Sequence, residues 1–188
     1  MANRVLRTFL ALEIPPNIRS QLSTQRNAVR EDLPRARWTR PQAWHLTLKF
    51  LGDSECRVLD ELKTDLRPRL IGIGAIQVRL GGTGFFPSPS RPRVGWVGGA
   101  AEGIEGVVEA VETSARSVRI PPEKRRWGLH LTLARIRDRW SPEAVDRFLE
   151  WGEALDFEPF TCNEVVLFSS DLRPDGAVYT AMERFTLE

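Results

Sequence analysis

One tetrapeptide occurs twice in this sequence and holds both of its histidines: His45–Leu48 and His130–Leu133 each read His-Leu-Thr-Leu. Side chains alternate between the two faces of a β-strand, so the histidine and threonine of each copy share one face and the leucines take the other. Each copy therefore offers an imidazole and a hydroxyl above an apolar anchor. If the copies lie side by side about a pseudo-twofold axis, both pairs converge on one cleft.

Paired imidazoles are what general acid–base catalysis requires, because imidazole gains and loses a proton near neutral pH. The alternative is that each tetrapeptide is an ordinary leucine-rich strand with a structural histidine, and a single copy would favour that interpretation. Two identical copies that use every histidine favour a shared site, and two imidazole–hydroxyl pairs suit a phosphodiester. We therefore expect His45, Thr47, His130 and Thr132 to be catalytic.

The segments around the two motifs alternate between the periodicities of strands and helices. Strands are expected at Val5–Ile14, Trp44–Gly52, Ala75–Phe86, Arg93–Val97, Gly128–Ile136, Phe157–Phe168 and Ala177–Leu187. Helices are expected from Pro16 to about Arg30, from a cap at Asp53–Ser54 to near Gly72, over Ile104–Val118, and from Ser141 to about Leu155. The order is β-α-β-α-β followed by β-α-β-α-β-β, with each motif in the second strand of its half, which indicates an internal duplication.

Glycine and proline clusters mark the joints between these elements. Gly81-Gly82 is expected to distort a strand, and it is not a phosphate-binding loop because no Gly-Lys-Ser/Thr and no helix follow it. Gly98-Gly99 is expected to end a strand. Residues 173–176 (Arg-Pro-Asp-Gly) predict the turn of a terminal antiparallel hairpin.

Length and composition fit one domain over residues 1–188, since 188 residues with 41% hydrophobic content can bury a core. The formal charge of +2 is close to balanced and implies no histone-type basic tail, but it leaves room for a local basic patch. All but three of the 27 basic residues are arginine, which suits phosphate binding but equally fits a bias of genome composition. The basic loop Leu33–Pro41 is expected to pack Trp38 on the core and leave its arginines in solvent, with ligand contact as the alternative.

Cys56 and Cys162 are isolated and lack metal-ligand spacing, so no zinc site is expected. The sequence starts without a secretory signal and contains no apolar run near the roughly 20 residues of a membrane span. These features predict a reduced, cytoplasmic protein that does not enter a membrane.

These motifs resemble those of the 2H phosphoesterase superfamily, and within it the bacterial and archaeal RNA 2′,3′-cyclic phosphodiesterases once called 2′-5′ RNA ligases. That superfamily carries two His-x-Thr/Ser-x motifs in which x is apolar. The similarity covers almost the whole chain, in the segments Arg7–Leu12, Trp44–Gly52, Gly84–Pro87, Arg93–Trp96, His130–Arg135 and Leu167–Ser170 and at Tyr179. Gly128-Leu129 departs from it, because relatives often have an aromatic residue and a proline there.

The resemblance implies a bilobal α+β fold, in which two β-α-β-α-β units are related by a pseudo-twofold axis, antiparallel sheets line a central cleft and helices lie outside. It implies no metal and no cofactor. The implied reaction converts RNA 2′,3′-cyclic phosphate ends to 2′-phosphates, with 2′-5′ RNA ligation as its reverse. The expected partner is RNA with such an end or a small cyclic nucleotide, and the protein is expected to be a monomer without a protein partner.

In this reaction we expect His130 to act as general base on water and His45 as general acid on the departing 3′ oxygen, while Thr47 and Thr132 donate hydrogen bonds to the phosphate. Two histidines needed in opposite protonation states predict a bell-shaped activity profile between about pH 5 and 8. Other classes of function remain: a noncatalytic RNA-end or nucleotide-binding module, a structural domain with the motifs in its core, or a phosphodiesterase for small cyclic nucleotides or 2′-5′ oligonucleotides.

Two further residues are candidates for substrate binding. The resemblance places Arg135 near the substrate, although strict alternation from His130 points it away from the cleft unless a strand end or bulge turns it back. Phe50 follows His45 at the same offset at which Arg135 follows His130. It is expected in the core, and the alternative is a platform on which a terminal base stacks.

Overall fold

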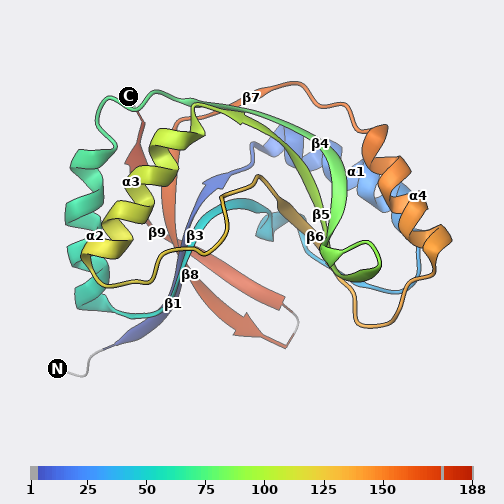
Figure 1. The fold of residues 1–188 in the computed structure, drawn as a ribbon, viewed down its shortest axis with the longest axis horizontal. Coiled ribbons are helices and arrows are strands. Elements are labelled where there is room, and N and C mark those ends of the chain that lie inside the picture. The colour runs from blue at the N-terminus through green and yellow to red at the C-terminus, as the bar shows by residue number, and fades with distance from the viewer. Residues whose placement is uncertain (1–3, 175, 188) are drawn as a thin grey trace.

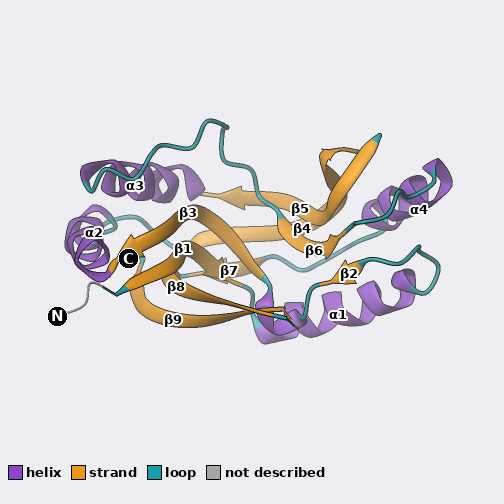
Figure 2. Cartoon of the chain, turned by 90° about the horizontal axis from the view of Figure 1, so that it is seen from below, coloured by secondary structure: helices purple, strands orange, loops and turns teal. Residues whose placement is uncertain are grey.

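Two antiparallel sheets form the centre of the molecule in the computed structural model, which describes residues 4–174 and 176–187 (Figures 1 and 2). Sheet A has the strand order β3-β1-β8-β9, and sheet B has the order β2-β6-β5-β4-β7. The strands are β1 (Val5–Glu13), β2 (Arg37–Trp38), β3 (His45–Glu55), β4 (Ile76–Ser88), β5 (Arg91–Glu102), β6 (Leu131–Arg135), β7 (Phe160–Cys162), β8 (Glu164–Arg173) and β9 (Gly176–Thr186).

The helices lie outside the sheets at the two ends of the molecule (Figures 1 and 2). They are α1 (Pro16–Arg30), α2 (Cys56–Arg69), α3 (Ile104–Ser117) and α4 (Pro142–Glu153), with a 3-10 turn η1 (Pro41–Ala43) before β3. The pair α2 and α3 packs together beside β3, and α4 packs on β4 near α1. The α+β fold with outer helices is thus confirmed.

The chain contains a duplication whose halves exchange a strand. β1-α1-β3-α2-β4 repeats as β5-α3-β6-α4-β8, and the orders β3-β1-β8 and β6-β5-β4 match position by position. In each of these two matched sets, the first two strands come from one half of the chain and the third strand comes from the other half. The duplication predicted from the two motifs is confirmed, but each lobe contains strands of both halves.

The four motif leucines hold β3 and β6 in the core. Leu46, Leu131 and Leu133 are 0% exposed and Leu48 is 4% exposed. Burying an aliphatic side chain of this size contributes about 1.5–3 kcal/mol. The backs of both motif strands are therefore fixed.

Several predicted boundaries are wrong because strand pairing extends past local signals. Asp53 and Ser54 do not cap a helix, since they pair with Arg7 and Leu6 in β1, and α2 begins at Cys56 without a side-chain cap. β5 continues through Gly98-Gly99 to Glu102. Gly99 has φ 145°, and a side chain there would meet the carbonyl oxygen of Arg79 in β4, so glycine permits the pairing rather than ending it.

The segment Phe157–Phe168 is two strands rather than one. Phe160–Cys162 pairs with β4 in sheet B, whereas the strand from Glu164 pairs with β1 and β9 in sheet A. The terminal hairpin of β8 and β9 is confirmed, although Asp175 of its turn lies outside the described residues. The Ser141 cap is also confirmed, since its hydroxyl accepts a hydrogen bond from the Ala144 amide at 3.3 Å.

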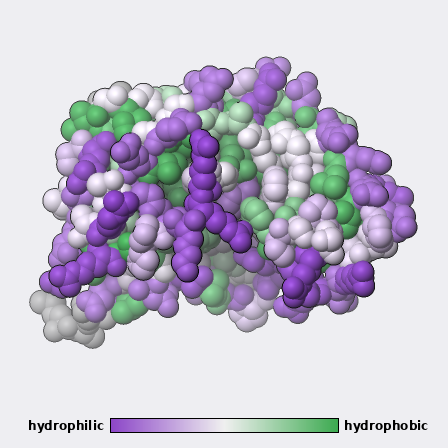
Figure 3. All heavy atoms as spheres, in the orientation of Figure 1, coloured by the Kyte–Doolittle hydropathy of each residue, from purple (hydrophilic) through white to green (hydrophobic). Residues whose placement is uncertain are grey.

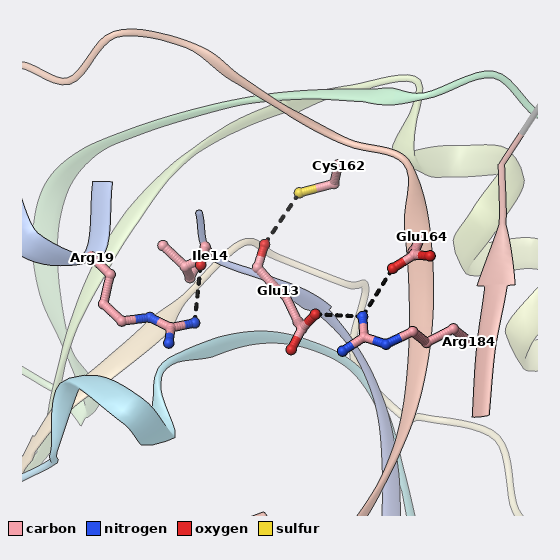
Figure 4. Close-up of polar contacts among 6 residues, drawn as sticks. All are labelled: Glu13, Ile14, Arg19, Cys162, Glu164 and Arg184. Carbon is pink, nitrogen blue, oxygen red and sulfur yellow. Dashed lines mark hydrogen bonds and ion pairs between the residues drawn. The ribbon is translucent and has the colours of Figure 1, made fainter. Parts of the chain in front are cut away.

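A polar network joins strand ends of the two sheets (Figure 4). Nη1 of Arg184 in β9 contacts carboxylate oxygens of Glu13 at 2.6 Å and Glu164 at 2.9 Å. The Cys162 thiol of β7 donates to the Glu13 carbonyl at 3.5 Å, and Arg19 donates to the Ile14 carbonyl at 3.0 Å. These contacts fix the end of β1 next to the start of β3, because Glu13 pairs with His45.

Candidate active site

The two histidines are held by the same local hydrogen bond. Nδ1 of His45 lies 2.9 Å from the Ala43 carbonyl oxygen, and Nδ1 of His130 lies 2.9 Å from that of Gly128. A carbonyl only accepts, so Nδ1 carries the proton of each neutral ring and Nε2 is left to accept one. Both imidazoles are thus oriented with the same nitrogen available for chemistry.

A cleft of about 630 Å³ between the sheets collects all four residues that were predicted to be catalytic: His45, Thr47, His130 and Thr132. Its side chains come from both sheets and from the β8–β9 hairpin. Strongly hydrophilic side chains cross the middle of the face seen in Figure 3, and hydrophobic ones show in the recess behind them. The two motifs therefore face one cavity from separate sheets instead of pairing as neighbouring strands.

Matched β-bulges follow the two histidine–threonine pairs. Leu10 pairs with Lys49 and Ala11 with Thr47, so Leu48 has no partner in β1. In the second copy Gly95 pairs with Ala134 and Trp96 with Thr132, which leaves Leu133 without one in β5. An extra residue shifts the alternation of side chains by one position. The side chains two residues after Leu48 and two residues after Leu133 therefore point to the cleft again.

The bulges bring Phe50 and Arg135 into the cleft at equivalent places. Arg135 lines the cleft although strict alternation from His130 pointed it away, and the bulge is the reason that strict alternation fails. The expectation that Phe50 belongs to the core is wrong, since its side chain is 55% exposed. Its ring lies 5.9 Å from that of Phe9, centroid to centroid, and leaves a face open to the cleft.

The two imidazoles differ in their surroundings. The ring of His45 lies 4.6 Å from Phe9 and 5.0 Å from Tyr179, which meets it edge-on. Burial lowers the pKa of His45 from 6.5 to about 4, the hydrogen bond to Ala43 opposes this shift, and the charge of His130 adds to it. His130 has Phe86 at 5.2 Å, also edge-on. In the free protein His45 is therefore neutral at pH 7.

The cleft is electropositive. Five arginines line it and no carboxylate does so among the described residues: Arg7, Arg37, Arg40, Arg135 and Arg173. They come from both sheets and from the loop before β3. A cavity with this lining favours a polyanion.

The loop before β3 was only partly anticipated. Trp38 packs on the core as expected, but Arg37 and Arg40 line the cleft instead of facing only bulk solvent. Thr39 of this loop donates to the carbonyl oxygen of Thr132 at 2.8 Å and accepts from the Trp44 indole at 2.8 Å. The loop thus connects Trp44, which directly precedes the first motif, to the backbone of the second motif.

Tyr179 and Arg7 are cleft residues that motif reasoning alone missed. Burial raises the pKa of Tyr179, while the charges of Arg135 and Arg7 lower it, so its hydroxyl is protonated at neutral pH. Alternation gave a signal for Arg7, because it lies two residues before Phe9 on the same strand face. For Tyr179 the sequence offered only its place in the family pattern.

No group of three or more histidine, cysteine or acidic side chains that could hold a metal ion occurs among residues 4–174 and 176–187. Within the same residues no helix has the length and apolar character needed to span a membrane.

A cleft of this kind between duplicated sheets is the architecture of a phosphoesterase family. The family model described as "LigT like Phosphoesterase" matches residues 12–96 and again residues 97–179, so the chain belongs to this family. Each match contains one copy of the His-Leu-Thr-Leu motif, and the boundary between the two matches falls within β5.

Relatives match along most of their length. A Thermus thermophilus protein named RNA 2′,3′-cyclic phosphodiesterase is 35% identical over 191 residues, covering 97% of this chain and 90% of the relative. One of the same name from Methanothermobacter thermautotrophicus is 29% identical over 186 residues, covering 97% and 99%.

Solved structures match over nearly the full chain as well. The Thermus thermophilus protein TT0787 superposes with a TM-score of 0.77 at 27% identity, covering 97% of this chain and 98% of that one. Escherichia coli LigT complexed with 3′-AMP superposes with a TM-score of 0.74 at 22% identity, covering 98% and 99%. The second comparison establishes the shared fold.

Proposed function

We propose that this protein hydrolyses RNA 2′,3′-cyclic phosphate ends to 2′-phosphates by two-histidine acid–base catalysis. The observation that carries this is the pair of imidazoles, each fixed through Nδ1 and each beside a threonine, in one arginine-lined cleft. The names of the relatives support the substrate class. A binding module would not need two identically oriented bases.

The cleft supplies a group for each need of the reaction. One Nε2 takes the proton of the attacking water, and the other gives a proton to the departing 3′ oxygen. Thr47 and Thr132 donate hydrogen bonds to the non-bridging phosphate oxygens, where negative charge grows in the transition state. With a 5′ hydroxyl in place of water, the same groups would open the cyclic phosphate to a 2′-5′ phosphodiester and release the 3′ oxygen as a hydroxyl, which is 2′-5′ ligation.

We assign His130 as the base and His45 as the acid. A pKa of about 4 makes His45 a strong proton donor, but it leaves the ring neutral in the free protein at pH 7. The anionic phosphate of the substrate favours the protonated ring when it binds. The opposite assignment would need no such rise in pKa, so the roles call for a direct test.

The test of the function is hydrolysis of a short RNA ending in a 2′,3′-cyclic phosphate, with EDTA present. We expect a 2′-phosphate product, and we expect His45→Ala and His130→Ala to lower kcat by about 10²–10⁴ while the variants stay folded. Thr47→Val and Thr132→Val should each cost about 10²-fold. Folded wild-type protein that binds this RNA but does not turn it over would move the assignment to a binding module.

A nitrophenyl phosphodiester separates the acid from the base. Nitrophenolate leaves without being protonated, so the variant that lacks the acid should recover most of its relative activity on this substrate. We expect recovery for His45→Ala and none for His130→Ala. Recovery in the reverse order would exchange the two roles and leave the proposed reaction intact.

A further inference from the structure

A lysine is buried directly behind the first motif. The Lys49 side chain is 0% exposed, and its Nζ donates to the two carboxylate oxygens of Glu112 in α3 at 2.8 and 3.0 Å. It also donates to the carbonyl oxygen of Pro121 at 3.0 Å. All three ammonium N–H groups have an acceptor, as a buried charge requires.

The bulge at Leu48 explains why this lysine turns away from the cleft. It places Lys49 on the helix side of β3, one residue before Phe50 returns to the cleft. The equivalent residue of the second motif is Ala134, which is buried and apolar. The repeated scaffold therefore accepts an alanine at this position, and the ion pair is particular to the first copy.

Lys49 holds the segment that leads to the second histidine. Residues 118–130 leave α3 and cross the molecule to β6 (Figure 1). Near its start, the Pro121 carbonyl is bound by Lys49, and near its end, the Trp127 indole donates to the Thr47 carbonyl at 2.9 Å. The next residue, Gly128, supplies the carbonyl that orients His130.

We propose that Lys49 is a positioning residue for His130. Lys49 and Thr47 anchor residues 121–127 to β3, so the first motif's strand sets the place of the Gly128 carbonyl. Since Gly128 has no side chain and a Cβ there would meet nothing within 4 Å, local packing around it does little to fix this carbonyl. The lysine reaches neither the substrate nor the cleft. The effect that we expect Lys49 to have on turnover rests on the proposed function.

The test uses a variant that removes the anchor without leaving a buried charge. Lys49→Met alone would strand the Glu112 carboxylate, whereas the double variant Lys49→Met/Glu112→Met replaces the ion pair with apolar side chains, a change that proteins often tolerate. We expect a folded protein whose kcat on the cyclic-phosphate RNA falls about 10- to 100-fold. KM should change less than about threefold, because substrate groups are untouched. Lys63→Met, which removes a lysine paired with Asp60 on the surface of α2, is the matched control and should keep its kcat.

An NMR measurement separates positioning from general damage. The chain has two histidines, so their imidazole nitrogen signals are assigned from the His→Ala variants. In the double variant we expect His130 to lose its single Nδ1–H tautomer, while His45, bound to Ala43, keeps its own. Unchanged kcat and unchanged His130 signals in the folded double variant would overturn the role, as would equal changes at both histidines. The tautomer readout stands even if the wild type proves inactive on RNA.

Discussion

At the scale of single residues, His45 and His130 each make the same local hydrogen bond through Nδ1, but aromatic side chains enclose them to different extents. The Nδ1 contacts are both 2.9 Å long. Aromatic rings close around His45, whereas His130 lies at the end of a loop. Burial is thus the main cause that separates the protonation behaviour of His45 from that of a free imidazole.

This burial predicts how stability depends on pH. His45 has a pKa of about 4 in the folded protein and about 6.5 when unfolded, so between these values the unfolded chain binds more protons. The free energy of unfolding should therefore fall as the pH drops from 6.5 to 4, by at most about 3 kcal/mol from this residue. We expect His45→Gln to lose less stability over that window in urea unfolding. His130→Gln keeps His45 and should show the full loss; equal losses in all three proteins would contradict this.

The sequence predicted the four motif residues because identity and spacing were enough. The two copies of the tetrapeptide contain both histidines of the chain. Once both copies lie on strands, the spacing within each copy determines which of its side chains share a face. The difference between the copies could not be predicted. It arises from Phe9 and Tyr179, which are far from His45 in the chain and approach it only through sheet pairing.

At the scale of elements, the bulges decide which side chains line the cleft beside the two histidine–threonine pairs. Without them, Phe50 and Arg135 would share a face with the buried leucines. A bulge depends on the register between two strands, which periodicity within one strand does not reveal. This is why Arg135 needed the family resemblance and why Phe50 was misplaced.

The exposed ring of Phe50 predicts stacking on a base next to the cyclic phosphate. We expect Phe50→Ala to raise KM for the RNA about 5- to 100-fold, since stacking contributes about 1–3 kcal/mol per base. Phe50→Trp should preserve KM, and kcat should change little in both. Ile71→Ala removes another exposed apolar side chain, 77% exposed and outside the cleft, and serves as control. An unaltered KM in Phe50→Ala would rule the platform out.

Helices and strands were predictable where the apolar pattern is long, as in β1, α1 and α3. Boundaries failed where a tertiary partner prevailed over a local signal. Asp53-Ser54 is a good cap sequence, but β1 continues alongside it and takes its backbone groups. The break after Cys162 is invisible in sequence because both of its sides have strand character.

At the scale of the whole molecule, charge is distributed unevenly. The formal charge is only +2, yet five arginines and no described carboxylate line the cleft. One cyclic phosphate does not need five arginines, even though Arg173 is also paired with Asp171 at 2.8 Å. The excess is suited to further phosphates along an RNA strand.

This arrangement predicts a salt dependence that grows with substrate length. The logarithm of kcat/KM should fall with the logarithm of salt concentration more steeply for an oligonucleotide than for a mononucleoside 2′,3′-cyclic phosphate. Arg7→Gln and Arg37→Gln should each reduce the oligonucleotide slope by about 0.7 and leave the mononucleotide slope unchanged. Arg91→Gln changes an exposed arginine outside the cleft and is the control. Equal slopes for both substrates would contradict an extended phosphate path.

The exchange of third strands between the sheets is the arrangement that two identical subunits adopt when each donates an element to its partner, as in a domain-swapped dimer. A true twofold axis would force identical surroundings on both histidines of such a dimer. Joined in one chain, the two copies are free to diverge, and the cage of Phe9, Phe168 and Tyr179 around one imidazole has no counterpart of that size around the other among the described residues. Covalent fusion thus allows the two halves of the site to differ, as the proposed reaction requires, because in that reaction one imidazole takes a proton and the other gives one up.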